Sequence, residues 1–392
     1  MKKIFIVINS LNGGGAERVA SILSQSLTKT TDLTIVSLES KQHDEYAFQG
    51  NIHYLDIDLK KSYVSRMRET IKKFNVLVAH EHPHLIVAFL NNACLVTILS
   101  KHQGIKTILS IRNYVDLQYK GKKLVLWQHI YKRFFSRADK IVSVSNEISE
   151  LMVNKYHLKA DKCVTIYNPY DLDAISSACS EKIPDVYLNQ MRGKKVIATL
   201  GHLGTQKAME RLINVLPSIV QEVPNILLLI IGSTENTKYF QMLKDLAETK
   251  QVTDSILFVG SQQNPFKYLH AADAYCLSSQ FEGFPNALVE AMACGLPVVA
   301  TNCHSGPKEI ISDSPLSNLY QETEYGILVD GKDDVVTSDG LSSIESNMQK
   351  GLVKLLTDDS LNAKYRSQSL KRVKDFSVDL IVEKWQALIA SL

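Results

Sequence analysis

The sequence of 392 residues contains no long apolar run, no paired-cysteine motif and no strong excess of one charge. A bilayer span needs roughly 18 to 20 apolar residues in a row, and even the stretch 85–99 is interrupted by Asn91 and Asn92. The six cysteines form no Cys-x-x-Cys pair and lie mostly in or beside apolar runs. This argues against zinc and predicts buried thiols in a reducing compartment. The ordinary composition excludes disordered, collagen-like and coiled-coil classes.

The first residues imitate a secretion signal without completing one. Lys2 and Lys3 precede an apolar run that stops after five residues at Asn9, which is too short for a signal core and predicts a first β-strand. The charges are distributed unevenly, because residues 1–175 carry 24 Lys and Arg against 16 Asp and Glu, whereas the remainder carries 20 against 25. The first half of the chain therefore presents the basic surface.

Short apolar runs alternate with helical segments in two successive cycles. The first cycle opens with a strand at 4–8, a glycine turn at 13–15 and a helix from about 17 to 27. This order predicts a Rossmann-like unit, and its repetition predicts parallel sheets with helices on both faces. The other predicted strands are 33–38, 85–90, 107–111, 140–144, 195–200, 226–231, 256–259, 274–277, 298–300 and 326–329.

The length and the break between the cycles predict two domains. Periodicity is low between about 170 and 193, where the chain is polar and contains Pro184. We therefore predict an α/β chain with one Rossmann-like domain at 1–175 and a second at 176–376. The last segment, 377–392, is predicted to be an amphipathic helix because its large apolar residues fall on one side.

The most informative segment, 281–300, reads as loop, helix, turn and strand. Asn286 is the expected N-cap, and good helix formers follow until Gly295. Glu282 and Glu290, with seven residues between them, therefore bracket one helix N-terminus. Such a terminus attracts phosphate, and flanking carboxylates suit sugar or ribose hydroxyls. The segment indicates a nucleotide-sugar site.

This segment resembles the paired-glutamate motif of retaining GT-B glycosyltransferases of family four, the group 1 enzymes of bacterial polysaccharide synthesis. The resemblance implies two Rossmann-like domains that face an interdomain cleft, with the C-terminal helix crossing back to the first domain. It also implies that Glu290 binds the ribose hydroxyls and that Glu282 acts beside the donor sugar. The backbone between them, at Gly283, Phe284, Pro285, Asn286 and Ala287, is then expected to meet the sugar or the diphosphate.

A second motif, 201–208, follows a predicted strand and precedes a helix. A departing nucleoside diphosphate gains charge in the transition state, so a fixed cation near its oxygens lowers the barrier. Lys207 is the expected cation, with Gly201 and His202 beside it. The family commonly has an arginine where His202 stands and often a glycine where Ala208 stands. A histidine is only partly charged near neutrality, so this departure keeps a non-catalytic partner subunit open as an alternative.

Other glycine and polar turns at strand ends complete the expected donor site. The triple-glycine turn lacks the G-x-G-x-x-G spacing, which argues against a dinucleotide cofactor. By resemblance, Gly14 and Gly15 lie against the donor diphosphate or the acceptor. By the same resemblance, Gly232, Ser233 and Gln262 border the base.

The acceptor side is expected in the first domain. Asn91, Arg112 and Asn113 follow predicted strands, and ligands of this fold bind at such strand ends. The pair Asp56 and Asp58 has the spacing of a metal-binding acid pair of the other glycosyltransferase fold. It stands here without the matching architecture, so we predict no metal requirement and no cofactor besides the donor.

Residues 120–140 combine seven Lys and Arg with several aromatic and aliphatic residues and a single acid. Two interpretations stay open. A helix with basic and aromatic faces can lie on an anionic membrane, or its aromatic residues can face the domain's own core while the cations are solvated. No nucleic-acid module is recognisable, so nucleic acid is not an expected partner.

Together these features predict a metal-independent retaining glycosyltransferase. We expect it to move a hexose or N-acetylhexosamine from a nucleotide sugar, most readily a UDP-sugar, to a hydroxyl of a lipid-linked glycan. The expected location is the cytoplasm, at the inner face of the plasma membrane. A nucleotide-sugar epimerase shares this fold and remains an alternative, although it needs paired acid and base residues that the sequence does not identify.

Overall fold

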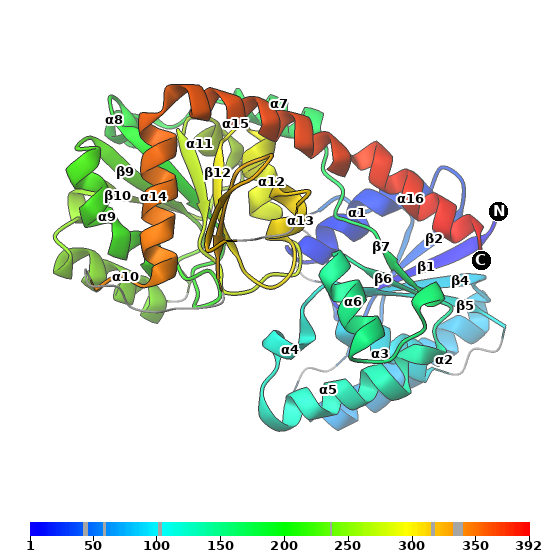
Figure 1. The fold of residues 1–392 in the computed structure, drawn as a ribbon. Helices are drawn as coiled ribbons and strands as arrows, with labels where there is room; N and C mark the ends of the chain where they lie inside the picture. The colour runs from blue at the N-terminus through cyan, green and yellow to red at the C-terminus, as the bar shows by residue number, and fades with distance from the viewer. Residues whose placement is uncertain (42–45, 58–59, 101–103, 236, 315–317, 332–339) are drawn as a thin grey trace. The chain divides into compact units, whose positions relative to one another are not determined.

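The computed structural model describes residues 1–41, 46–57, 60–100, 104–235, 237–314, 318–331 and 340–392. The chain divides into two compact units (Figure 1). Unit 1 comprises Met1–Pro169 and Val378–Leu392, and unit 2 comprises Tyr170–Ser377. The division falls at Tyr170, a few residues before the predicted boundary of 175. The reason is that the Tyr170 N–H donates to the Phe376 carbonyl oxygen at 2.9 Å, inside unit 2.

The sheet of unit 1 is parallel throughout, with its described strands in the order β3-β2-β1-β4-β5-β6-β7. β1 is buried along nearly its whole length because it pairs with β2 and β4 in the centre. The strand order reverses between β1 and β4, which makes this pair the topological switch point of the unit. The strands are β1 Lys3–Ile8, β2 Asp32–Ser37, β3 Asn51–Tyr54, β4 Leu85–Phe89, β5 Lys106–Ile111, β6 Lys140–Ser143 and β7 Cys163–Thr165.

Helices connect most of these parallel strands, as the crossovers of a doubly wound fold require. Ser62 caps α2, and Ser145 caps α6, through side chains that accept a backbone N–H of the first turn. The helices of unit 1 are α1 Gly15–Leu27, α2 Tyr63–Glu81, α3 Asn91–Leu99, α4 Val115–Gln118, α5 Gly121–Arg133, α6 Asn146–Asn154 and α16 Val378–Ala390.

Unit 2 repeats the same winding. Its described strands follow the order β10-β9-β8-β11-β12-β14-β13, parallel except for β13 at one edge. The order reverses between β8 and β11, the second switch point. The strands are β8 Lys195–Leu200, β9 Ile226–Ile231, β10 Ile256–Gly260, β11 Ala274–Leu277, β12 Val298–Asn302, β13 Tyr320–Glu322 and β14 Ile327–Asp330. The helices are α7 Leu172–Cys179, α8 Asp185–Met191, α9 Glu210–Glu222, α10 Thr237–Thr249, α11 Phe266–His270, α12 Asn286–Ala293, α13 Pro307–Ile311, α14 Ser343–Thr357 and α15 Asp359–Arg372.

The predicted doubly wound fold is confirmed in both units. The sequence missed β3, β7 and β13, which have three or four residues each. Each occupies the edge of its sheet, where half-exposed residues do not form the continuous apolar run by which buried strands are recognised.

The C-terminal helix α16 packs on unit 1, as the resemblance implied. Its Ile381, Trp385 and Ile389 join the core that contains β1 and α1. The Trp385 ring lies 5.8 Å from the ring of Phe89 and is fully buried. In Figure 1 this last helix, drawn in red, runs beside α1. The end of the chain therefore completes the first core.

The aromatic side of the basic segment 120–140 faces the interior of unit 1. Trp127 and Tyr131 of α5 and Phe135 after it are at most 3% exposed. Val125 and Leu126 point to solvent, with exposed fractions of 65% and 54%, among exposed cations of the same helix. No helix within the described part of the chain combines the length and apolar character needed to cross a bilayer.

All six cysteines lie in the described residues and are free thiols. Cys94, Cys276, Cys294 and Cys303 are buried, as predicted, whereas Cys163 and Cys179 are half-buried. The Cys179 thiol donates to the Cys294 sulfur at 3.4 Å. Burial raises the pKa of the Cys94 thiol well above its usual range, which keeps that thiol protonated and unreactive.

Replacing Trp385 with alanine tests whether α16 is part of the first core. We expect Trp385→Ala to lower the free energy of unfolding of unit 1 by about 3 to 5 kcal/mol, because a large buried side chain is lost and a cavity remains. Trp127, the other tryptophan of the chain, also lies in unit 1 and serves as the fluorescence reporter during urea unfolding. Gln386→Ala, at an exposed position of the same helix, is the control. Equal stability of both variants would contradict the assignment.

Candidate functional site

The switch point of unit 2 brings two of the predicted site residues together. Lys207 follows β8 and Glu282 follows β11, and these strands are neighbours in the sheet. The carboxyl ends of parallel strands meet at one edge, so residues 75 positions apart come into contact. The Lys207 Nζ lies 2.7 Å from the Glu282 Oε1.

This ion pair is largely removed from solvent. The side chains of Lys207 and Glu282 are 20% and 8% exposed, and the Ser279 hydroxyl donates to the same Glu282 oxygen at 2.7 Å. A buried carboxylate is costly unless a cation and hydrogen bonds compensate it. The arrangement therefore holds one cation and one carboxylate in defined positions. His202, the third predicted catalytic residue, is exposed.

The loops that carry the pair are tied to each other through backbone groups. The Gln280 N–H donates to the Gln206 carbonyl oxygen at 2.8 Å, and the Gln206 side chain donates to the Phe281 carbonyl oxygen at 2.9 Å. The Ser278 hydroxyl donates to the Lys207 carbonyl oxygen at 2.7 Å. Sequence reasoning missed these residues, because side chains that bond to the backbone leave no characteristic spacing.

Two positions in this region have a backbone conformation or a close contact that favours glycine. Ala208 is buried with a φ of 46°, a left-handed conformation that costs an alanine on the order of 1 kcal/mol more than a glycine. This is the position where the family often has glycine. A Cβ added at Gly232 would lie 1.9 Å from the Gly201 carbonyl oxygen, so the approach of these two loops requires glycine at 232.

Helix α12 carries the second glutamate. Glu290 is 8% exposed and lies in the second turn of this helix. The predicted N-cap was wrong, because Pro285 occupies the cap and Asn286 is the first helical residue. The Asn286 Oδ1 instead accepts a hydrogen bond from the Tyr170 hydroxyl at 2.6 Å. The amide is therefore used to anchor the segment that enters unit 2.

A neighbouring loop fixes the backbone between the two glutamates. The Glu282 N–H donates to the His304 carbonyl oxygen at 3.1 Å, and the Ser305 hydroxyl donates to the Gly283 carbonyl oxygen at 2.6 Å. Gly306 has a φ of 101°, and a Cβ there would lie 2.5 Å from the Pro285 Cδ. Gly283, Phe284 and Pro285 are thus packed against this loop.

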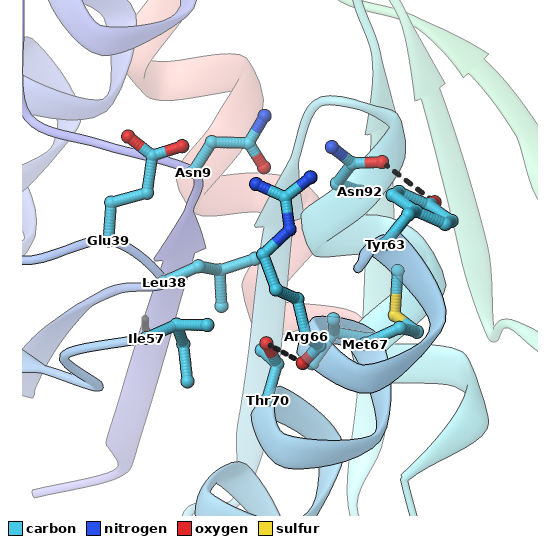
Figure 2. Close-up of a pocket in the computed structure, with 10 residues that line it drawn as sticks. Asn9, Leu38, Glu39, Ile57, Tyr63, Arg66, Met67, Thr70 and Asn92 are labelled. Carbon is cyan, nitrogen blue, oxygen red and sulfur yellow. Dashed lines mark hydrogen bonds between the residues drawn. The ribbon is translucent and has the colours of Figure 1, made fainter. Parts of the chain in front are cut away.

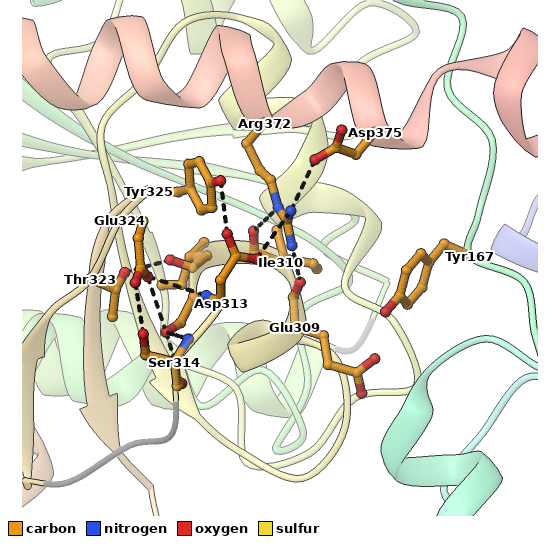
Figure 3. Close-up of polar contacts among 12 residues, drawn as sticks. Tyr167, Glu309, Ile310, Asp313, Ser314, Thr323, Glu324, Tyr325, Arg372 and Asp375 are labelled. Carbon is orange, nitrogen blue, oxygen red and sulfur yellow. Dashed lines mark hydrogen bonds and ion pairs between the residues drawn. The ribbon is translucent and has the colours of Figure 1, made fainter.

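The helix that follows this loop, α13, is held in turn by Arg372 (Figure 3). The guanidinium donates to the carbonyl oxygens of Ile310 at 2.9 Å and Glu309 at 2.7 Å, and it pairs with Asp375 at 2.9 Å. Carbonyl groups at a helix end have no partner within the helix, so these bonds stabilise α13 and the loop before it.

The remaining predicted donor residues of unit 2 lie after β9 and β10, at the same edge of the sheet. The Gly232 N–H donates to the Gly260 carbonyl oxygen at 2.9 Å. The Gln262 side chain donates to the Val259 carbonyl oxygen at 2.5 Å and accepts from the Tyr268 hydroxyl at 3.2 Å. Ser233 accepts a hydrogen bond from the Glu235 N–H. Gln262 therefore shapes its own turn.

In unit 1, the glycine turn is closed by an acidic side chain. Gly14 is the N-cap of α1 and Gly15 its first residue. A Cβ at Gly14 would lie 2.3 Å from the Glu17 Oε2, so the carboxylate folds over the glycine. Burial raises the pKa of Glu17, although its own backbone N–H and the nearby Arg112 counteract this shift.

The predicted acceptor residues of unit 1 differ in exposure. Asn91 is buried as the first residue of α3 and accepts a hydrogen bond from the Tyr131 hydroxyl at 2.7 Å. Arg112 is also buried, bonds to Asn168 and lies 5.8 Å from the Phe89 ring centroid. Asn113 is half-buried. The side chains of Asn91 and Arg112 thus contribute to the interior of the unit.

The described residues contain no group of three or more His, Cys, Asp or Glu side chains placed to hold a metal ion. Asp56 lies beyond the end of β3 with a φ of 50°. Asp58 lies outside the described residues. The absence of a metal requirement stays a prediction.

Comparison with known proteins identifies the family. Residues 13–174 match the model described as Glycosyltransferase Family 4, and residues 187–354 match the model described as Glycosyl transferases group 1. The chain belongs to the GT-B glycosyltransferases of these families, so the family named from the glutamate motif is confirmed.

Named relatives span most of the chain. An N-acetylgalactosaminyltransferase of Campylobacter jejuni, which acts on N-acetylgalactosamine-N,N'-diacetylbacillosaminyl-diphospho-undecaprenol, is 26% identical and covers 96% of both chains. A capsular polysaccharide biosynthesis glycosyltransferase of Staphylococcus aureus is 26% identical over 83% of this chain and 86% of its own. The solved structure of HepE from Anabaena, in complex with UDP and glucose, covers both chains completely with a TM-score of 0.78 at 18% identity. This last similarity supports the fold.

Coupling between Lys207 and Glu282 is measurable as stability. We expect Lys207→Met to destabilise unit 2 by about 1 to 3 kcal/mol, because it leaves a buried carboxylate with hydroxyl compensation alone. The double variant Lys207→Met/Glu282→Gln is expected to be less destabilised than the sum of the two single variants. Chemical unfolding followed by circular dichroism measures this coupling. Additive effects would show that the two charges do not depend on each other.

Proposed function

We propose that this glycosyltransferase is a retaining enzyme of surface polysaccharide synthesis. It transfers a hexose or N-acetylhexosamine from a UDP-sugar to a hydroxyl of a lipid-linked glycan. The observation that carries the proposal is the buried Lys207–Glu282 pair at the switch point of unit 2, beside the α12 segment that bears the buried Glu290. A cation, a helix N-terminus and carboxylates at one sheet edge suit a sugar diphosphate.

Positively and negatively charged groups recognise different parts of the donor. The Lys207 ammonium and the N–H groups at the start of α12 face the diphosphate and stabilise the charge that develops as it departs. Glu290 accepts hydrogen bonds from the ribose hydroxyls. UDP is favoured because the solved HepE structure contains UDP and glucose. An N-acetylhexosamine is favoured because the Campylobacter relative is named an N-acetylgalactosaminyltransferase.

Retention of configuration follows from attack on the face that the diphosphate leaves. The bond from the anomeric carbon to the diphosphate oxygen breaks while the acceptor oxygen forms its bond on the same face. The departing diphosphate oxygen then takes the acceptor proton. Glu282, whose Oε1 is held by Lys207 and Ser279, positions the sugar in this mechanism. No metal and no cofactor other than the donor take part.

A panel of nucleotide-sugar donors tests the proposed function. UDP-, GDP- and ADP-sugars are incubated with the protein in EDTA, and nucleotide release and sugar products are analysed. We expect release from one UDP-sugar, and a decrease of about ten- to a hundredfold in kcat/KM for Glu290→Gln, because hydrogen bonds to a charged acceptor are lost. Glu248→Gln, at an exposed site of the same unit, is expected to behave as the wild type.

The other outcomes identify the alternatives. An epimerised donor without nucleotide release would replace the transferase with an epimerase. A protein that neither binds nor turns over any donor would be a non-catalytic partner subunit. Activity lost in EDTA and restored by a divalent cation would overturn metal independence.

We also propose that α5 brings unit 1 to an anionic membrane surface at the cytoplasmic face. The exposed Val125 and Leu126 lie among exposed cations of the same helix, including Lys122, Lys123 and Arg133. Aliphatic side chains enter the interface, and each lysine or arginine near anionic lipid adds about 1 kcal/mol. The diphospho-undecaprenol in the name of the Campylobacter relative supports a substrate held at a membrane.

Vesicle binding tests this contact with a matched pair of variants. Val125 on α5 and Val76 on α2 are both 65% exposed. We expect Val125→Asp to reduce sedimentation with phosphatidylglycerol vesicles by about tenfold, because a charge replaces an inserted side chain. We expect Val76→Asp to have no such effect. Binding that is insensitive to salt, or equally sensitive to both substitutions, would contradict the proposal.

A further inference from the structure

Unit 1 contains an open hollow with a volume of about 100 Å³ at the carboxyl edge of its own sheet (Figure 2). Its wall is built by residues that follow β1, β2 and β3 and by the first two turns of α2 and α3. The loops after β1 and β4 leave the sheet at the switch point, where doubly wound folds bind their ligands. The residues used below are Asn9, Glu39, Tyr63, Arg66 and Asn92.

Three polar groups in this hollow have no partner. Within the described part of the chain, neither the Arg66 guanidinium nor the Glu39 carboxylate makes a hydrogen bond or an ion pair. The Asn9 Oδ1 is buried and likewise has no hydrogen-bond partner. Burial raises the pKa of Glu39, and the nearby positive charge of Arg66 partly offsets this. These groups line a concave site at the edge of the sheet and have no intramolecular partner among the described residues, so they are available to a ligand.

The charges of the side chains that line the hollow indicate the net charge of its ligand. One cation and one carboxylate stand in the same hollow, so an anionic ligand meets Glu39 and a cationic ligand meets Arg66. A neutral molecule whose groups both donate and accept hydrogen bonds satisfies both residues, and sugar hydroxyls have this property. The apolar part of the wall, formed by Leu38, Ile57, Met67 and Val96, suits the carbon face of a pyranose or an acetamido methyl group.

We propose that this hollow binds the terminal sugar of the acceptor, a neutral hexose or N-acetylhexosamine, with Arg66 and Glu39 as the specificity-determining pair. The inference rests on the proposed transferase function and adds the chemical class of the acceptor. It also identifies Asn92 as the asparagine at the start of α3 that faces the ligand. The neighbouring Asn91 is bonded to Tyr131, whereas Asn92 lines the hollow and accepts from the Tyr63 hydroxyl at 3.5 Å.

Saturation-transfer NMR on the full chain tests the proposal without requiring turnover. The probes are methyl α-glucoside, methyl N-acetyl-α-galactosaminide, methyl glucuronide and inorganic pyrophosphate. We expect at least one neutral glycoside to bind, and about a tenfold weaker affinity in Arg66→Gln and in Glu39→Gln, because each loses charge-assisted hydrogen bonds. Arg68→Gln, at an exposed position of the same helix, is expected to bind as the wild type.

Two further measurements keep the outcomes separable. Tryptophan fluorescence reports on the folding of the variants, since Trp127 and Trp385 both lie in unit 1. Arg66→Lys keeps the charge without the planar fork, and we expect it to recover part of the binding. A structural role for Arg66 would instead change stability without changing the preference among probes.

Preferential binding of pyrophosphate or glucuronide, lost in Arg66→Gln, would overturn the neutral-sugar assignment in favour of an anion site. Absence of glycoside binding at 20 mM, a chosen upper concentration on the order of weak single-sugar affinities, would overturn the proposal. Glycoside binding without turnover of any donor would support the sugar site in the hollow and contradict the transferase function. Donor turnover together with glycoside binding that neither variant weakens would support the transferase function and contradict the assignment of Arg66 and Glu39.

Discussion

The carboxyl ends of parallel strands all lie at the same edge of a sheet, and this constraint determines where the candidate site residues of both units lie. Where the strand order reverses, the loops of two neighbouring strands leave in opposite directions and open a crevice. In unit 2 these loops bring Lys207 and Glu282 into contact. In unit 1 they lead from β1 to Asn9 and from β4 to Asn92 in the first turn of α3, and both asparagines line the hollow. The pairing of the strands therefore determines which residues, far apart in the sequence, lie close together in space.

The ion pair in unit 2 compensates the charge of a lysine that is largely removed from solvent. An ammonium group held in a partly buried position without a counterion pays a large desolvation penalty. Glu282 supplies the counterion at 2.7 Å, and Ser279 holds the carboxylate in place. In the proposed function, a diphosphate that approaches Lys207 competes with this carboxylate and does not have to reorganise a mobile side chain. This is the electrostatic preorganisation on which transfer of charged groups depends.

The backbone strain at Ala208 also helps to hold Lys207 in a fixed position. Ala208 is the residue directly after Lys207 and adopts a left-handed backbone conformation while fully buried. The surrounding backbone bonds, such as that from Ser278 to the Lys207 carbonyl oxygen, maintain a conformation that alanine alone does not favour. Part of the stability of the fold is thus used to set the direction of one lysine side chain.

The sequence predicted what depends on local pattern, and it missed what depends on tertiary contacts. The bounds of β8, β9 and β11 agree with the structure because each is a buried run. The glutamate motif identified the family and placed Glu282 and Lys207 in one site. The cap at Asn286 failed because Tyr170, 116 residues away, competes for that amide. No local signal distinguishes Asn92 from Asn91, since only the packing of α3 decides which of the two faces Tyr131.

The hollow of unit 1 escaped sequence analysis for a related reason. Arg66 lies within α2, where an arginine usually extends into solvent, and Glu39 follows a strand without any motif around it. Only the fold sets a cation and a carboxylate on the same wall, beside a buried Asn9 oxygen that has no hydrogen-bond partner among the described residues. Composition had indicated a basic first half, yet the hollow itself is balanced in charge.

The contrast between a hollow with balanced charge and a basic surface is what the proposed lipid-linked acceptor requires. Tyr63 lines the hollow, and its pKa is raised first by burial and then by the phenol of Tyr119 nearby. The ring of Tyr119 stacks on the ring of Trp127 of α5, with 5.5 Å between their centroids, so Tyr119 lies near both the hollow and the basic helix. A sugar is neutral and needs paired donors and acceptors, whereas the diphosphate and lipid headgroups around it are anionic and need exposed cations. One unit thereby offers each part of such a substrate the charge that it requires.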